Sequence, residues 1–144
     1  MPEIKITAEE MRYIALFQDL TRAAVRDCII DNDNNRLIFL VRKGELGLAV
    51  GRGGSNVRRL RQLLNRDIEV VEYDDSLEGL AKSLFYPARV RDIKLVKSSN
   101  GRQTLYVTVD PRDKGLAIGR GGKTVSRARL VLKRYYNIDN VIVI

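Results

Sequence analysis

One twelve-residue pattern occurs twice in this chain, and each copy is centred on the tetrapeptide Gly-Arg-Gly-Gly. Residues 46–57 read LGLAVGRGGSNV and residues 114–125 read KGLAIGRGGKTV, so eight of the twelve positions are identical at an offset of 68 residues. An internal repeat of this length indicates two copies of one folded unit. The repeat therefore predicts two modules, residues 1–75 and residues 76–144.

The segments around the glycines predict the same order of elements in both modules. A capping-box sequence at Thr7–Glu10 begins a first helix, two β-rich runs flank a turn, and an amphipathic helix and a final strand follow the glycines. The second module repeats this order, and Ala88–Asp92 echoes Ala23–Asp27 at an offset of 65 residues. A slightly longer second hairpin accounts for the change of offset. The pattern predicts an α+β fold in which helices and a sheet form layers.

The charge distribution indicates a polyanionic partner. The chain has a formal net charge of +8 and a sequence pI near 9.9. Residues 1–75 contain 12 Lys+Arg and 13 Asp+Glu, whereas residues 76–144 contain 14 and 5, so the halves carry −1 and +9. Both glycine motifs lie in locally basic stretches, and we expect the second to be the more electropositive.

Several classes of function are disfavoured by the residues that are missing. The chain has no histidine and a single cysteine, Cys28, which excludes Cys/His zinc sites and Ser-His or Cys-His nucleophile systems. Gly122-Lys123-Thr124 resembles the end of a P-loop, but Ala117 stands where that motif requires glycine. We predict no catalytic residue, metal or cofactor. No apolar run approaches the roughly 18 residues of a membrane span, and we expect a cytoplasmic protein.

The glycine segments resemble the signature of KH RNA-binding modules. Val50–Val57 and Ile118–Val125 both fit aliphatic-Gly-x-x-Gly-x-x-aliphatic, and two matches in register are far more specific than one. The remaining helix and strand precede each signature, as in type II KH modules. A tandem pair of this kind is similar to archaeal NusA-like proteins. The resemblance implies two tandem type II KH domains, each a three-stranded sheet packed on one side by helices.

The resemblance also implies a binding site in each module. In KH modules the Gly-x-x-Gly loop clamps the backbone of about four nucleotides, and the bases enter an adjoining groove. The implied RNA-binding residues are Gly51, Arg52, Gly53, Gly54, Arg58, Arg59, Gly119, Arg120, Gly121, Gly122, Lys123 and Arg127. The implied groove walls, which core packing would explain equally well, are Leu48, Val50, Val57, Leu116, Ile118 and Val125.

The resemblance implies a non-enzymatic factor that binds single-stranded RNA in transcription termination or antitermination. Only Tyr73–Ser76 joins the predicted modules, so we expect them to read one continuous strand. RNA polymerase is a second candidate partner, no membrane partner is expected, and we expect a monomer. Two alternatives stay open: a ribosomal RNA-binding or ribosome-assembly factor, and a scaffold that docks on RNA polymerase through the acidic first half.

Overall fold

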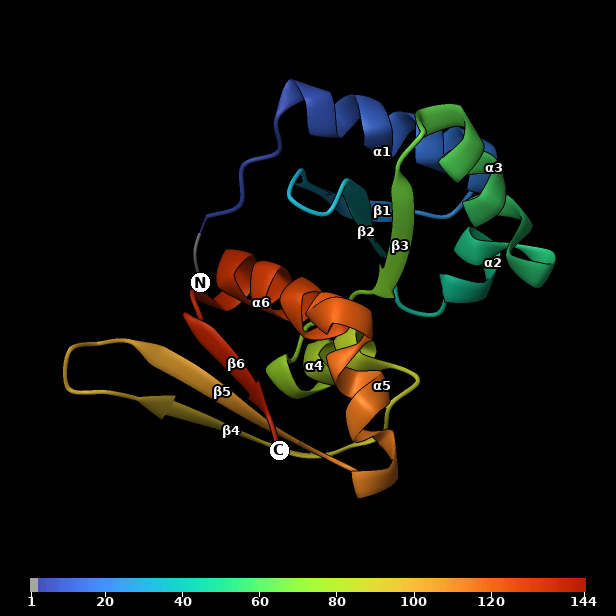
Figure 1. The fold of residues 1–144 in the computed structure, drawn as a ribbon. Helices are drawn as coiled ribbons and strands as arrows, with labels where there is room; N and C mark the ends of the chain where they lie inside the picture. Colours follow the sequence, from blue (N-terminus) through green and yellow to red (C-terminus); the bar gives the residue numbers. More distant parts are fainter. Residues whose placement is uncertain (1–2) are drawn as a thin grey trace. The chain divides into compact units, whose positions relative to one another are not determined.

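The computed structural model describes residues 3–144, which form two compact units (Figure 1). One unit is Lys5–Asp74, and the other is Asp75–Ile144 together with residues 3–4. The first module contains α1 (Ala8–Thr21), β1 (Val25–Asp31), β2 (Arg36–Val41), α2 (Leu46–Val50), the 3₁₀ turn η1 (Arg52–Gly54), α3 (Ser55–Leu64) and β3 (Asp67–Glu72). The second contains α4 (Leu77–Phe85), β4 (Val90–Lys97), β5 (Gln103–Val109), the 3₁₀ turns η2 (Pro111–Asp113) and η3 (Arg120–Gly122), α5 (Lys114–Ile118), α6 (Lys123–Tyr136) and β6 (Asn140–Val143). The predicted order of elements is confirmed in both modules.

Each module is built on a three-stranded sheet with the same pairing. β1 and β2 are antiparallel and β2 and β3 are parallel, and β4, β5 and β6 repeat this arrangement. The register shifts at the same place in both hairpins, between Val25 and Asp27 and between Val90 and Asp92. The α+β class predicted from the repeat is therefore confirmed. The two sheets also share a bulge at the start of the first strand.

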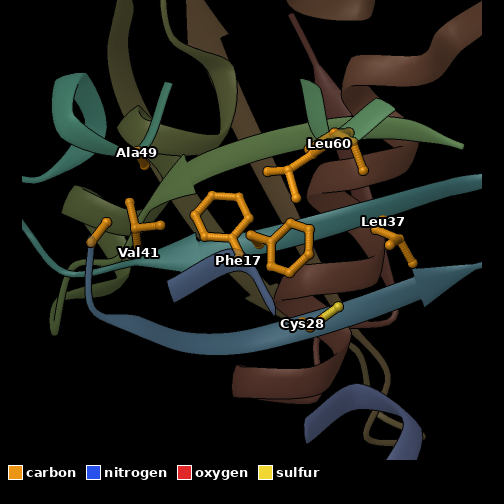
Figure 2. Packing of buried hydrophobic residues seen from close by; sticks show 9 residues of the cluster. Phe17, Cys28, Leu37, Val41, Ala49 and Leu60 are labelled. Atoms are coloured by element: carbon orange, nitrogen blue, oxygen red, sulfur yellow. The ribbon is translucent and has the colours of Figure 1, made fainter. Parts of the chain in front are cut away.

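The core of the first module lies between its helices and one face of its sheet (Figure 2). The rings of Phe17 from α1 and Phe39 from β2 stack at a centroid distance of 4.2 Å with an interplanar angle of 30°. Ala49 of α2 and Leu60 of α3 join this cluster, and both are 0% exposed. The small Ala49 side chain holds the short helix α2 tightly against the core, directly before the glycine motif.

The second module repeats this arrangement with α4 and α6. Leu80, Leu84 and Phe85 of α4 are fully buried, and α6 buries Val125, Ala128, Val131, Leu132 and Tyr135. The partner of Ala49 in the repeat is Ala117 of α5, which is also 0% exposed. Both short helices are thus held against a core by an alanine two residues before the first glycine of the motif.

A buried ion-pair network crosses the first sheet. The Arg36 side chain is 0% exposed, and its Nε donates to Asp31 at 2.7 Å while its Nη1 donates to Glu69 at 3.0 Å. Burial raises the pKa of the Asp31 carboxyl, but hydrogen bonds from Asn34 and Arg36 and the charge of Arg36 outweigh it, so this pKa lies below its usual value. If one of the two carboxylates were removed, the positive charge of the buried guanidinium would be incompletely neutralised.

We predict that Asp31→Asn lowers the free energy of unfolding at pH 7 by about 3 kcal/mol, because it leaves Arg36 with one acidic partner. The folded-state pKa of Asp31 is depressed, so its contribution is present above the unfolded pKa of about 3.9 and is lost as pH falls through the folded value. Urea unfolding followed by circular dichroism should give a difference from wild type that shrinks below about pH 3.

The control is Lys82→Gln, which removes an exposed ion pair with Glu78 on α4. We expect this change to cost no more than about 0.5 kcal/mol at any pH. An equal cost for both variants at pH 7 would contradict the role given to the buried network.

Candidate nucleic-acid interface

The two Gly-Arg-Gly-Gly loops have the same backbone conformation. Gly51 and Gly119 have φ/ψ of 80°/167° and 81°/167°, and the last glycines, Gly54 and Gly122, have φ of 77° in the left-handed region. The third residues, Gly53 and Gly121, also have positive φ, at 59° and 63°. Residues with a Cβ avoid the conformation of Gly51 and Gly119, so the loop shape itself requires glycine there.

Close packing reinforces this requirement at the first glycine of each motif. A Cβ at Gly51 would lie 2.8 Å from Ser55 Oγ, and one at Gly119 would lie 2.4 Å from Thr124 Oγ1 and 2.7 Å from the Thr124 backbone nitrogen. A Cβ at Gly53 or Gly121 would meet nothing within 4 Å. The first glycine is therefore packed inside the loop, whereas the third faces open space.

Hydrogen bonds within each loop leave part of its backbone pointing outward. The N–H of Gly51 donates to Gly47 O at 2.9 Å, and the N–H of Gly54 donates back to Gly51 O at 3.0 Å. The equivalent bonds in the second loop measure 2.9 and 3.1 Å. The N–H groups of Arg52 and Gly53 take no part in these bonds, and they precede the N-terminus of α3, where the helix dipole favours an anion.

The segment that enters each short helix is anchored by an acidic side chain at the same repeat position. In the first module Glu45 accepts a hydrogen bond from the N–H of Ala24 at 2.8 Å, and in the second Asp113 accepts one from the N–H of Arg89 at 2.9 Å. The Arg89 guanidinium, which also donates to Asp113, holds the pKa of this carboxyl below its usual value. These contacts fix where α2 and α5 begin, and hence where the loops lie.

Apolar side chains lie exposed beside both loops. Leu48 is 51% exposed, Leu116 49% and Ile118 38%, because Ala49 and Ala117 take the inward-facing positions of the short helices. Val50 and Val57 are partly buried, and Val57 packs against the first core. Val125 is 7% exposed and belongs to the second core. The predicted groove positions thus include an outward-facing leucine in each module and one residue, Val125, that packs inward.

The cationic side chains around the loops come from acid-free stretches. Residues 46–66 contain five arginines and no Asp or Glu, and residues 114–138 contain seven Lys+Arg and no acid. Arg52, Arg120 and Lys123 are exposed on or next to the loops. Arg59 is also exposed, but it lines a shallow hollow with Leu16, Asp19 and Leu20 on the side of α3 that faces α1.

Two of the predicted RNA-binding arginines make hydrogen bonds within their own modules. The Arg58 guanidinium folds back over the first loop and donates through Nη1 to the carbonyl oxygen of Gly53. Arg127 instead turns inward, and its Nη2 donates to the carbonyl oxygen of Leu84 near the end of α4. Arg58 therefore adds positive charge at the loop itself, while Arg127 joins α6 to α4.

Three further positions belong to the site although sequence reasoning missed them. Gly47 and Gly115 lie exposed on α2 and α5, one turn before the first glycine of each motif, and a Cβ at either would meet nothing within 4 Å. Asn56 donates through Nδ2 to Leu48 O at 3.2 Å and so ties α3 to α2. The sequence did contain a signal for Gly47 and Gly115, because both belong to the identical positions of the twelve-residue repeat.

The described part of the chain offers no other obvious chemistry. Among residues 3–144 there is no group of three or more Cys, Asp or Glu side chains placed to hold a metal ion. No helix in the same range is both long and apolar enough to cross a membrane. The glycine loops and their surroundings are therefore the candidate site.

The comparisons show the family of the chain. A family model described as KH domain matches residues 11–97, which is more than half of the chain. The "Probable transcription termination protein NusA" of Halococcus morrhuae is 35% identical over 138 residues, covering 96% of both chains. This chain belongs to the archaeal NusA-like family of KH-domain proteins. The crystal structure of APE1850 is also similar, with 44% identity, a TM-score of 0.88, and coverage of 96% of this chain and 100% of that one.

A shorter match links the NusA-like chain to a ribosomal protein. The "Small ribosomal subunit protein uS3" of Sulfurisphaera tokodaii is 34% identical over 80 residues, which is 56% of this chain and 32% of that protein. The match covers only about half of the chain and about a third of the ribosomal protein.

We predict that Gly119→Ala lowers the free energy of unfolding by about 1–3 kcal/mol, because alanine would be strained at φ 81° and its Cβ would collide with Thr124. Gly121→Asn is the matched control, since asparagine tolerates the left-handed region and meets no neighbour. We expect this control to cost less than about 1 kcal/mol in urea unfolding. Equal costs would show that the loop does not need glycine at position 119.

Proposed function

We propose that this protein is a non-enzymatic factor that binds single-stranded RNA through its two Gly-Arg-Gly-Gly loops and acts in transcription termination or antitermination. The observation that supports it most is the duplicated loop: the same glycine-dependent backbone occurs twice, each time before a helix N-terminus and within an acid-free basic stretch. Backbone N–H groups, the helix dipole and arginine all favour an anion, and KH modules use such a loop on phosphates.

The proposed clamp in each module consists of the loop backbone and the cations nearest to it. In the first module these are Gly51–Gly54 with Arg52 and Arg58, and in the second Gly119–Gly122 with Arg120 and Lys123. Arg59 is a peripheral contact of the first clamp in this proposal, and Arg127 is left out because it donates to Leu84. The guanidinium fork of arginine suits the oxygen pair of a phosphate.

The bases would lie against α2 and α5, next to the clamped backbone. Leu48 and Leu116 are half exposed there, and a base that covered them would remove apolar surface from water. Gly47 and Gly115 leave the helix backbone bare on the same short helices, so that a planar base could approach it closely. Ile118 would extend this surface in the second module.

We propose a role in transcription because of the family to which the chain belongs. Relatives with the NusA name cover nearly the whole of this chain, and those names refer to transcription termination. We propose RNA polymerase as a second partner for the same reason, and a cytoplasmic monomer as the working form. The scaffold alternative predicts a polymerase complex that survives RNase treatment.

Ribosomal RNA binding is a second candidate, favoured by the match to the small-subunit protein uS3. Crosslinking and sequencing of bound RNA from cells would separate the two. Nascent transcripts near termination sites would support the leading proposal, whereas an enrichment of ribosomal RNA would favour the alternative.

We predict that Arg120→Asp with Gly121→Asp weakens binding to single-stranded RNA by at least about ten-fold at 0.1 M salt, because two carboxylates then face the phosphate. Arg52→Asp with Gly53→Asp should weaken binding less, since the halves of the chain carry +9 and −1. Filter-binding titration with a mixed-sequence RNA pool measures both. Equal losses would contradict the ranking.

The matched control is Arg120→Gln with Gly121→Asn. It also places a side chain at the positive φ of position 121, but it adds no negative charge. It should lose less affinity than the aspartate pair and keep the wild-type unfolding midpoint. If the aspartate pair bound RNA as tightly as wild type, the loops would not be the clamps.

We predict opposite effects on folding and on binding for Gly47→Ala with Gly115→Ala. Alanine is favoured over glycine in an exposed helix by about 0.5–1 kcal/mol, and both sites have room for a Cβ, so stability should rise. RNA affinity should fall by a few-fold or more, because the methyl groups would hold the base off the backbone. Urea unfolding and fluorescence anisotropy give the two readouts. An unchanged affinity would place the bases elsewhere.

A further inference from the structure

The hairpin of β4 and β5 in the second module is unusually exposed. Every residue from Lys94 to Arg102 is exposed, including Leu95 at 44% and Val96 at 39%. In Figure 1 the hairpin extends well beyond the helices of its own module. β5 buries Leu105, Val107 and Val109, but the tip of the hairpin, residues 94–102, is exposed throughout and contributes little to the core. Stability alone therefore does not account for the length of the tip.

The first module provides an internal comparison. Its hairpin, β1 and β2, is mostly buried, and all six residues of β2 are buried. The offset between the repeats grows from 65 at the first strand to 68 at the glycines, so the second hairpin is 68 − 65 = 3 residues longer. The duplicated fold does not need this extension, because the first module is complete without it.

The two hairpins also differ in charge. Residues 93–109 contain Lys94, Lys97 and Arg102 and no Asp or Glu, whereas residues 28–41 contain Asp31, Asp33 and the buried Arg36. Within residues 3–144, neither Lys94 nor Lys97 takes part in an ion pair, and Arg102 lies near Asp139 of the same module. We call Lys94, Lys97 and Arg102 the hairpin cations.

The turn that joins β4 to β5 directly follows Lys97 and includes Arg102, and its own hydrogen bonds hold it in shape. The N–H of Ser98 donates to Arg102 O at 2.8 Å, that of Gly101 to Ser98 O at 2.9 Å, and that of Arg102 to Asn100 Oδ1 at 3.2 Å. The Ser98 hydroxyl also donates to Asn100 Oδ1. A preformed turn presents its charges with little ordering cost on binding.

The hairpin lies too far from the glycine loop to serve the same nucleotides. In Figure 1 its turn is at the opposite end of the second module from the connection between α5 and α6. A KH loop clamps only about four nucleotides, so the hairpin cations would meet a different stretch of a longer RNA.

We propose that the β4–β5 hairpin is a second, sequence-independent RNA-contact element, whose cations bind phosphates outside the nucleotides held by the glycine loop. This inference rests on the proposed function. The exposed tip, residues 94–102, has no aromatic side chain on which a base could stack. Strand alternation places Lys94 and Lys97 on opposite faces of the ribbon, so phosphates would be contacted on both faces. Lys94 shares its face with Val96 and Tyr106, which line a hollow together with Asp92. Charge is what this surface offers, and phosphate complements it.

The test is the triple variant Lys94→Gln, Lys97→Gln, Arg102→Gln, titrated by fluorescence anisotropy against mixed-sequence single-stranded RNAs of about six and about 24 nucleotides. The shorter RNA fills a clamp, and the longer one also reaches the hairpin. Loss of three phosphate contacts should weaken binding of the long RNA by about ten- to a hundred-fold at 0.1 M salt and reduce the slope of log K against log salt by about 2. Binding of the short RNA should stay unchanged.

The matched control neutralises three cations away from the hairpin and the loops, in Lys5→Gln, Arg12→Gln, Lys82→Gln. It lowers net charge equally and should leave the long-RNA affinity within about two-fold of wild type. Unchanged binding of both RNAs by the hairpin variant, or an equal loss for both lengths, would overturn the proposal. Failure of the proposed function has a different signature, since the Arg120→Asp, Gly121→Asp protein would then bind the short RNA as tightly as wild type.

Discussion

The backbone conformation of one glycine in each module governs the site. Gly51 and Gly119 have φ near 80° and ψ of 167°, and their Cα atoms pack against residues of the following helix at distances that exclude a Cβ. This conformation turns the chain from the short helix into the long one. It leaves the next two residues, an arginine and a glycine, on the outside. Without that turn, the loop N–H groups and the helix N-terminus would not face the same space.

The alanines two residues before these glycines fix the positions of the short helices. Ala49 and Ala117 are 0% exposed and hold the short helices against their cores, which turns Leu48 and Leu116 toward solvent. A five-residue helix has little stability of its own, so its position depends on this contact and on the acidic anchors at Glu45 and Asp113. Core packing thereby sets the shape of the proposed base-binding surface.

Duplication lets one module serve as a reference for the other. The sheet pairing, the bulge, the loop dihedrals and the asparagine caps Asn65 and Asn137 agree between the copies. Two differences lie at or near the proposed RNA contacts. The first loop has Arg58 folded over it where the second module has Ser126, and the second module has the longer hairpin, with no Asp or Glu in residues 93–109. Because the fold is otherwise shared, we expect any difference in RNA binding between the modules to arise from these features.

The sequence by itself determined the two modules, the element order and the glycine loops, because repeat spacing, hydrophobic periodicity and glycine chemistry are local properties. Tertiary structure alone decided which neighbouring side chains face outward. Val57 and Val125 occupy the same repeat position yet differ in burial, and Arg127, which reads as part of a basic helix face, turns inward to Leu84. Such outcomes depend on contacts with residues distant in the chain, and a periodic pattern carries no information about those contacts.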